Sequence, residues 1–236
     1  MSDQPLNEQE LAALTAFDTP TICNALELLV PERRAMGFTT SSLVAPFPEL
    51  PPMVGYARTC TIRAAEPSSA SKESLRKQRF DYFDYVASKP GPTISIVQDL
   101  DDGRPGFGSF WGEVNSNIHR ALGCLGTVTN GSIRDIDAIA EGFRMLAGKV
   151  GPSHAHVHMV EFGCDVSVGG MNVCSGDLVH ADRHGAVVIP HAVARKVPEA
   201  AALLGRREAV ILDVCRGSDF TVEKLKQAIG AADEIH

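Results

Sequence analysis

Two short motifs carry the side chains best suited to chemistry in this chain. Gly112-Glu113 follows a glycine-rich loop at 103–112, and Arg134-Asp135 comes later in the sequence. Two carboxylates therefore flank one guanidinium. Arg binds a carboxylate or enolate oxygen through paired hydrogen bonds, and a hard divalent cation takes carboxylate and water ligands. This set of residues predicts chemistry on a 2-oxo acid.

The glycine-rich loop ends at the start of an expected helix over residues 113–122. The first N–H groups of a helix have no partner within it, and here they belong to Val114 and Asn115. With the positive end of the helix dipole, they favour a bound carboxylate. An expected strand at 127–129 delivers Arg134 from a neighbouring loop, so we expect both loops to converge on one pocket.

Hydrophobic periodicity predicts an α/β chain in which helices and strands alternate. Residues 65–79 are polar and rich in Ser, which indicates a loop or a mobile lid. Helices are expected at 8–16, 20–30 (with Thr19 as N-cap), 113–122, 133–146, 191–204 and 220–230. Strands are expected at 53–64, 93–98, 127–129, 155–162, 165–168 and within 178–189.

The composition predicts one globular domain of a cytoplasmic protein. A hydrophobic share of 44% and a charged share of 22% are typical of a packed fold. The formal net charge of −7, with no basic run, argues against nucleic acid as a partner. No apolar run reaches the ~18 residues of a membrane span, and the N-terminus lacks a secretory signal, so we expect no membrane association. Most of the six cysteines are expected to be buried as small hydrophobic residues.

A competing metal motif consists of His154, His156 and His158, which alternate along an expected strand and resemble the metal motif of cupins. A cupin needs a second motif well downstream. Here the next candidates, near Gly176 and His180, follow too closely to leave room for the intervening strands. We therefore expect the three histidines to line an interface.

A second cluster of possible ligands, His180, Asp182 and His184, lies on an expected β-hairpin. The Ser-Gly-Asp sequence at 175–177 is typical of the turn that positions a structural hairpin. We therefore interpret this cluster as structural.

Together the two motifs resemble a known family. WGE at 111–113, followed by GTVTNGSIRD at 126–135, resembles the signature of RraA-like proteins and 4-hydroxy-4-methyl-2-oxoglutarate aldolases. DTPTICNALE, VGYARTCTIR and VCSGDLVHADRHGAVVIP resemble the N-terminal helix, first strand and C-terminal hairpin of that family. The resemblance implies a single α/β domain over 1–236 of the swivelling β/β/α type, with a mixed sheet and Gly-rich ligand loops. Residues 65–90 would be a variable insertion and 191–236 a helical extension.

The resemblance also implies roles for the motif residues. Asp135 would bind Mg²⁺ or Mn²⁺ directly, Arg134 would contact the pyruvyl group, and Glu113 would reach the metal through water. An adjacent subunit would add an acidic residue, for which Glu208 is the candidate, within a homotrimer or homohexamer. The substrate carboxylate would be held by the backbone at Gly112, Glu113, Val114 and Asn115.

Three positions depart from the pattern of the family. Asn130 and Asn24 stand where many members carry Asp, so an acidic role there is in doubt. Asn supports the same turn geometry, which we expect to survive. Glu113 replaces a shorter Asp, which shifts its carboxylate by about one methylene and alters the number of waters expected between it and a metal.

The function implied is that of a class II, metal-dependent aldolase. It would cleave a 4-hydroxy-2-oxo acid such as 4-hydroxy-4-methyl-2-oxoglutarate to pyruvate, and would decarboxylate oxaloacetate because both reactions pass through a pyruvate enolate. An ordered water would take the hydroxyl proton, since the motif contains no histidine. The alternative is a non-catalytic regulator that binds a ribonuclease or helicase, as some relatives do. A third hypothesis is the same site acting on another oxo acid, because 65–90 lies outside the resemblance.

Overall fold

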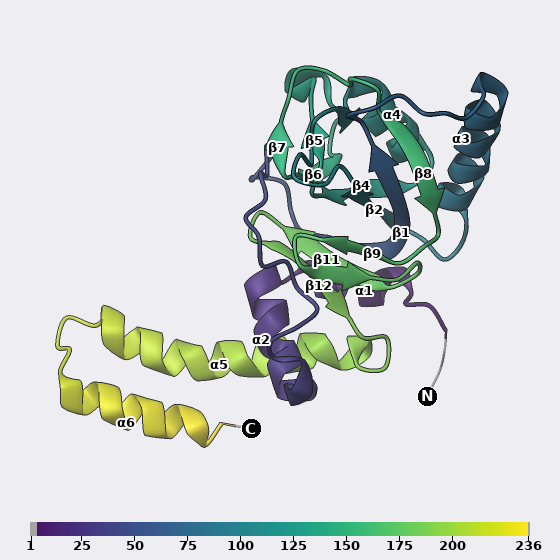
Figure 1. Cartoon of the computed structure of the whole chain (residues 1–236). Coiled ribbons are helices and arrows are strands. Elements are labelled where there is room, and N and C mark those ends of the chain that lie inside the picture. The colour runs from purple at the N-terminus through teal and green to yellow at the C-terminus, as the bar shows by residue number, and fades with distance from the viewer. Residues whose placement is uncertain (1–3, 236) are drawn as a thin grey trace.

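A seven-stranded mixed sheet forms the centre of the molecule in residues 4–235, which the computed structural model describes (Figure 1). The strands follow the order β12-β11-β1-β2-β4-β6, and β8 pairs with the C-terminal half of β1. The pairs β1–β2, β2–β4 and β4–β6 are parallel, and the others are antiparallel. The strands are β1 (Met53–Arg63), β2 (Thr93–Asp99), β4 (Cys124–Thr129), β6 (Arg144–Leu146), β8 (His158–Phe162), β11 (Leu178–Asp182) and β12 (Gly185–Ile189).

Two smaller sheets accompany the central one. A hairpin is formed by β9 (Val166–Val168) and β10 (Met171–Val173). A parallel three-stranded sheet contains β3 (Ser109–Trp111), β5 (Ser132–Ile133) and β7 (Lys149–Val150). Because β3 and β5 are neighbours and run in the same direction, the residues that follow them, Gly112 and Arg134, leave this small sheet at the same edge.

The helices lie at the two ends of the central sheet (Figure 1). Near β8 and the small parallel sheet lie α3 and α4, whereas α2, α5 and α6 lie beyond β12. Among the described residues, no helix combines the length and apolar character required to cross a membrane. The helices are α1 (Glu8–Thr15), α2 (Thr19–Leu29), α3 (Lys72–Ala87), α4 (Glu113–Ala121), α5 (Val197–Arg216) and α6 (Val222–Asp233), with short 3-10 turns at Pro31–Arg33, Ile136–Ala138 and Ala194–Lys196.

The long strand β1 is buried on both faces, which explains its nearly continuous apolar sequence. On one face, Val54 and Tyr56 pack with α1, α2 and α5. Farther along the same face, Cys60 and Ile62 pack with α3 and the β3–α4 segment. The other face packs against β9 and β10. One strand thus joins the helical end of the molecule to the end that carries the two motifs.

The prediction of a helix at 133–146 is wrong. The segment contains β5, one 3-10 turn and β6. Asp135 (φ 53°) and Gly142 (φ 74°) adopt left-handed conformations, which a right-handed helix does not accommodate. Met145 and Leu146 instead extend the central sheet by pairing β6 with β4.

The interpretation of 65–79 as a loop or lid is also wrong over its second half. Helix α3 begins at Lys72. Ser71 caps it by accepting a hydrogen bond from the amide of Ser74 at 3.1 Å. Ser71, within a segment whose composition predicts a loop, therefore marks the start of a 16-residue helix.

Two other helix boundaries differ from the expectation. The N-cap of α2 is Asp18, which accepts a hydrogen bond from the amide of Thr21, and Thr19 is the first helical residue. The helix expected at 191–204 starts later, at Val197, and continues to Arg216. It contacts α6, in which Ala228 and Ala232 are buried.

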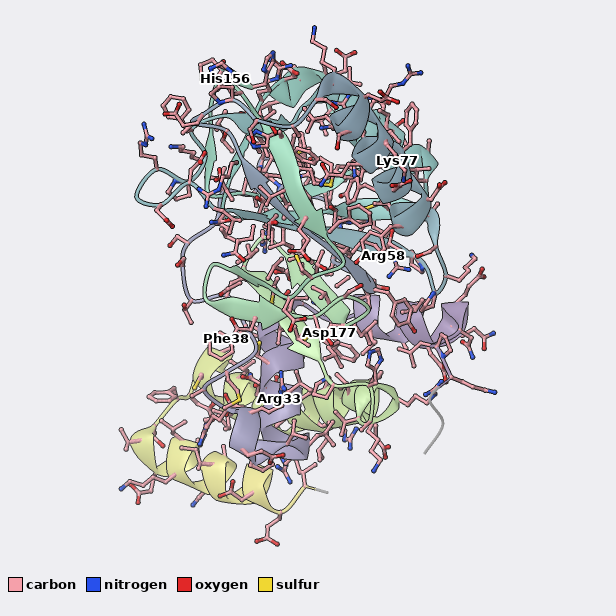
Figure 2. The ribbon with its side chains drawn as sticks, turned by 45° about the vertical axis from the view of Figure 1, so that its right-hand side comes forward. Arg33, Phe38, Arg58, Lys77, His156 and Asp177 are labelled. Atoms are coloured by element: carbon pink, nitrogen blue, oxygen red, sulfur yellow. The ribbon has the colours of Figure 1, made fainter. Side chains whose placement is uncertain are left out.

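The end of α3 is attached to β1 through Arg58 (Figure 2). The buried Arg58 guanidinium donates hydrogen bonds to the carbonyls of Tyr85 (3.0 Å), Ser88 (2.6 Å) and Pro90 (2.9 Å). A buried carbonyl that loses its hydrogen-bond donor lowers the stability of the fold. Because Arg58 satisfies three carbonyls at and after the last turn of α3, it holds the end of this helix in place.

Replacing Arg58 with Met is expected to lower the free energy of unfolding by about 2–4 kcal/mol, because buried carbonyls would lose charged donors. Urea unfolding followed by circular dichroism measures this change. The control is Arg76→Met on the exposed side of α3, which should change the free energy by less than about 0.5 kcal/mol. Equal effects of the two substitutions would contradict this role of Arg58.

Candidate active site

One cavity of about 270 Å³ contains both sequence motifs. Its walls come from α3, the β3–α4 junction, the residues after β5 and the segment that leads into β8. The structure therefore brings the two loops together. The predicted site residues that line this cavity are Gly112, Glu113, Val114, Asn115, Arg134 and Asp135.

The carboxylate of Asp135 lies against the start of α4. Its Oδ2 accepts a hydrogen bond from the amide of Glu113 at 3.3 Å and lies 3.4 Å from Nε of Arg134. Asp135 has a φ of 53°, a conformation that is uncommon outside glycine and that Asp tolerates better than most residues. Such strain is often found at functional sites.

Gly112 allows this close approach. A Cβ at position 112 would lie 2.5 Å from Oδ2 of Asp135 and 3.2 Å from Cγ of Arg134. The φ of Gly112 is −167°, an extended conformation that any residue adopts. Glycine is therefore required here for space and not for backbone freedom.

Several polar groups in the cavity have no hydrogen-bond partner within residues 4–235. They include the two terminal nitrogens of Arg134 and the amides of Val114 and Asn115. The backbone amide of Arg134 donates to the carbonyl of Trp111 at 2.9 Å, which holds the residue next to β3. A planar guanidinium edge and two free amides are the groups that bind carboxylates best.

The carboxylates in the cavity fit a hydrated divalent cation. Oδ1 of Asp135 and both side-chain oxygens of Glu113 have no hydrogen-bond donor among the residues described. Over the same residues, no group of three or more His, Cys, Asp or Glu side chains is placed to hold a metal. A cation held here would thus keep most of its water, as Mg²⁺ commonly does in proteins.

Behind the cavity, a buried hydrogen-bond chain fixes the first turn of α4. Nδ1–H of His119 donates to the carbonyl of Asn115 (2.7 Å), and Nε2 accepts from the hydroxyl of Tyr82 (3.2 Å). The Tyr82 hydroxyl also lies 3.0 Å from Oγ of Ser95. Burial lowers the pKa of His119 to about 4, so the ring is neutral at pH 7. The sequence analysis missed this chain because its members lie on three separate elements.

Asn130, one of the departures from the family pattern, joins two loops. Its Oδ1 accepts from the amide of Asp99 (2.7 Å), and its Nδ2 donates to the carbonyl of the same residue (3.0 Å). An ionised Asp cannot donate the second bond. The Asp99 carboxylate in turn accepts from the amide of Gly106 at 2.6 Å and so holds the glycine-rich loop. Asn130 thus has a structural use that needs its amide.

Two of the three histidines reach the cavity, which the sequence analysis did not foresee. His154 and His158 line it, and their Nδ1 atoms face the carbonyls of Ala155 and His156, each at 2.8 Å. His156 is exposed at the upper edge of the molecule, away from Lys77 of α3 (Figure 2). A tight turn, closed by a hydrogen bond from Val157 N to His154 O at 3.0 Å, spreads these side chains, so the described residues do not form the three-histidine set of a cupin.

The cluster on the hairpin β11–β12 holds the start of α2. The buried His180 ring contacts the hydroxyl of Thr19 (3.0 Å) and the carbonyl of Phe17 (3.0 Å). Asp182 accepts from the amide of Thr19 at 2.9 Å. These groups are occupied by structural contacts, in line with the interpretation of the hairpin.

Glu208, the candidate from an adjacent subunit, lies exposed on α5 and does not line the cavity of its own chain. Its role across a subunit boundary stays a prediction. The expectation that most cysteines are buried is wrong, because Cys174 and Cys215 are exposed and only Cys60 and Cys124 are fully buried. Burial raises the pKa of Cys60 to about 12, which makes it a poor nucleophile at neutral pH.

The stability of the protein is expected to depend on pH through His119. Because burial lowers its folded-state pKa below the unfolded value, the unfolded chain binds the extra proton as the pH falls from about 6.5 to about 4. The free energy of unfolding should fall by about 2–3 kcal/mol between pH 7 and pH 4.5 from this residue alone. The difference between wild type and His119→Gln in chemical denaturation at each pH isolates this contribution. Parallel pH curves for the two proteins would rule it out.

Replacing Gly112 with Ala is expected to disrupt the site while leaving the fold intact, because the added Cβ meets Oδ2 of Asp135. Binding of Mn²⁺, measured by electron paramagnetic resonance, should weaken by about tenfold or more. A tenfold loss of affinity corresponds to about 1.4 kcal/mol of binding free energy. The matched control is Gly205→Ala on α5, where a Cβ meets no atom within 4 Å. Unchanged Mn²⁺ affinity in the Gly112 variant would contradict the assigned contact.

Two solved structures share this architecture. A protein of unassigned function from Pseudomonas syringae pv. tomato has a TM-score of 0.72 at 22% identity, over 98% of this chain and 97% of its own. RraAS2 of Streptomyces coelicolor, an unusual member of the RNase ES inhibitor RraA protein family, has a TM-score of 0.66 at 23% identity, over 88% of this chain and 98% of its own. At these identities the likeness shows the fold alone.

The Legionella pneumophila protein DlpA is 28% identical over 91 residues, which are 35% of this chain. The matched part spans only 14% of the length of DlpA. The family model RraA-like, described as Aldolase/RraA, matches residues 19–188, a range that includes both motifs of the cavity. This match and the shared mixed α/β architecture confirm the resemblance and the fold class expected from the sequence. The chain belongs to the RraA-like (Aldolase/RraA) family.

Proposed function

We propose that the protein is a metal-dependent pyruvate aldolase, a class II lyase, that cleaves a 4-hydroxy-2-oxo acid to pyruvate. 4-Hydroxy-4-methyl-2-oxoglutarate exemplifies the substrate class, and decarboxylation of oxaloacetate is the side activity. The observation that supports the proposal is one cavity that contains the unpaired edge of Arg134, the unpaired Oδ1 of Asp135 and the free amides of α4. We further propose a cytoplasmic homotrimer or homohexamer, with Glu208 contributed across a subunit boundary.

The substrate is held at its 2-oxo acid end. The free amides of Val114 and Asn115, at the positive end of α4, bind the carboxylate. Arg134 donates to the ketone oxygen, where negative charge develops as the enolate forms. The contact between its Nε and Asp135 keeps the guanidinium in place. Together these groups orient C3 and C4 toward the α3 side of the cavity.

Cleavage breaks the C3–C4 bond, turns the C4 hydroxyl into a carbonyl and leaves the enolate of pyruvate. Asp135 would hold Mg²⁺ or Mn²⁺, with Glu113 reaching it through water, and the cation would polarise the ketone and stabilise the enolate charge. Arg134 stabilises the same oxygen, which lowers the barrier further. An ordered water next to Glu113 takes the hydroxyl proton, and C3 of the enolate is protonated from the solvent side of the cavity.

The rival function is that of a regulator that binds a ribonuclease or helicase without catalysis. RraAS2 of Streptomyces coelicolor belongs to a family of RNase ES inhibitors, and the formal net charge of −7 suits binding to a basic partner. A regulator does not need Oδ1 of Asp135 and the edge of Arg134 to be left unpaired in one cavity. We therefore favour the enzyme.

Release of pyruvate from 4-hydroxy-4-methyl-2-oxoglutarate with Mg²⁺ or Mn²⁺, followed with lactate dehydrogenase and NADH, tests the proposal. EDTA and Asp135→Ala should each reduce kcat by about 10²–10³-fold, the usual effect of losing one contact to a developing oxyanion. Asp137→Ala, which removes an exposed acid two positions later, is the matched control and should keep wild-type kcat. Absence of turnover on this acid and on oxaloacetate, with binding to a ribonuclease or helicase, would instead favour the regulator.

A further inference from the structure

Helix α3 presents one continuous face to the cavity. The α3 residues that line it are Leu75, Gln78, Arg79, Tyr82 and Phe83. They recur at the three- and four-residue spacing of a single helical face. Helix α3 therefore forms one wall of the pocket that also contains Arg134 and Asp135.

Two polar groups of this face are occupied by protein contacts. The side-chain amide of Gln78 donates to the carbonyl of Val160 at 2.9 Å. The hydroxyl of Tyr82 is engaged by Ser95 and His119, and Tyr82 itself is buried. Tyr82 therefore offers its ring to the cavity, and Leu75 and Phe83 offer only carbon atoms.

Other apolar side chains complete this part of the cavity. Phe110 lies on β3, Val157 lies just before β8, and Met159 lies in β8. All three are partly buried and pack against the core under α3. The cavity thus has a polar end at Arg134 and Asp135, whereas the part between α3 and β8 is lined mainly by carbon atoms together with His158, whose Nδ1 faces the carbonyl of His156.

We infer that the preferred substrate is a 2-oxo acid whose C4 carries an alkyl or aryl group in place of a second carboxylate. This inference rests on the proposed function for the reaction and adds the substrate class. With the 2-oxo acid end at Arg134, the C4 substituent extends between α3 and β8. A carboxylate there would lose water beside carbon atoms, and removing a charged group from water without a partner is costly. The cleavage products are pyruvate and an apolar aldehyde or ketone.

Arg79, His154 and His158 oppose this inference, because all three line the cavity. The side chain of Arg79 is exposed, so solvent screens its charge. His154 is exposed as well and turns its Nδ1 to a backbone carbonyl. A carboxylate on C4 of the substrate would have to reach Arg79 or His154 at the solvent-exposed side of the cavity. A test must therefore distinguish an apolar C4 substituent from a carboxylate bound by these residues.

The binding of 2-oxo acids that cannot be cleaved tests whether the cavity prefers an apolar substituent, without any turnover. With Mn²⁺ present, titration calorimetry compares pyruvate, 2-oxohexanoate and 2-oxoglutarate, the last two being similar in size. Affinity should rise by up to about fourfold for each carbon added to pyruvate in 2-oxohexanoate, as burial of CH₂ groups predicts. Binding of 2-oxoglutarate should be weaker than that of 2-oxohexanoate by about tenfold or more.

Substitutions on α3 test whether this helix causes the preference for 2-oxohexanoate over pyruvate. Phe83→Ala should reduce the advantage of 2-oxohexanoate over pyruvate by about fivefold or more, whereas Phe80→Ala, on the exposed side of the same helix, should leave it unchanged. Leu75→Asn provides a second variant outside the core clusters in case the first is destabilised. If 2-oxoglutarate binds best and Arg79→Gln abolishes that preference, the apolar substrate class is overturned.

Turnover separates this inference from the proposed reaction. Pyruvate release from 4-hydroxy-2-oxohexanoate should exceed that from 4-hydroxy-2-oxoglutarate by about tenfold in kcat/KM. If neither acid is cleaved while 2-oxohexanoate still binds best, the proposed aldol cleavage is wrong, but the inferred preference for an apolar C4 substituent is supported. If both are cleaved with 4-hydroxy-2-oxoglutarate preferred, the reaction stands and the inferred substrate class fails.

Discussion

The site depends on the contact between the Asp135 carboxylate and the start of α4. This contact needs a residue without a Cβ at position 112, a left-handed backbone at 135 and two parallel strands that end side by side. One carboxylate oxygen is used in the contact, and the other is left for a ligand. The same geometry keeps Arg134 close to Asp135 while the outer edge of its guanidinium stays unpaired.

Helix α3 links the stability of the fold to the shape of the pocket. Its C-terminal end is fixed by Arg58, and its middle contacts α4 through Tyr82 and His119. Because both attachments are buried, the C-terminal half of α3, which includes Tyr82 of the cavity wall, is held by the core. The same packing engages the Tyr82 hydroxyl and the side-chain nitrogen of Gln78, which leaves the Tyr82 ring and the carbon atoms of Leu75 and Phe83 on the cavity side of α3.

The sequence predicted the family, the fold class and the two loops that meet in the cavity. The Gly-acid and Arg-Asp motifs are local, and a parallel sheet brings the ends of its strands to one edge, so their convergence followed from general rules. The helix at 133–146 was wrong because apolar spacing does not report a left-handed residue such as Asp135. Helix α3 was missed at its start because a Ser-rich segment is typical both of loops and of N-caps.

Other parts of the site had no local signal in the sequence. His154 and His158 reach the cavity through a turn closed by Val157, and His119 meets Tyr82 across two helices. Such contacts depend on how elements pack, which spacing along one segment does not encode. The structural use of Asn130 likewise depends on the backbone of Asp99, which offers it both a donor and an acceptor.

The central claim is that one metal at Asp135 and the guanidinium of Arg134 act on the same ketone oxygen. A crystal grown with Mn²⁺ and oxalate, a stable mimic of the pyruvate enolate, tests it most directly through the anomalous signal of manganese. The account predicts manganese bound to Oδ1 of Asp135 and to oxalate, with Arg134 donating to an oxalate oxygen that manganese also contacts. Manganese bound elsewhere, or oxalate out of reach of Arg134, would contradict it.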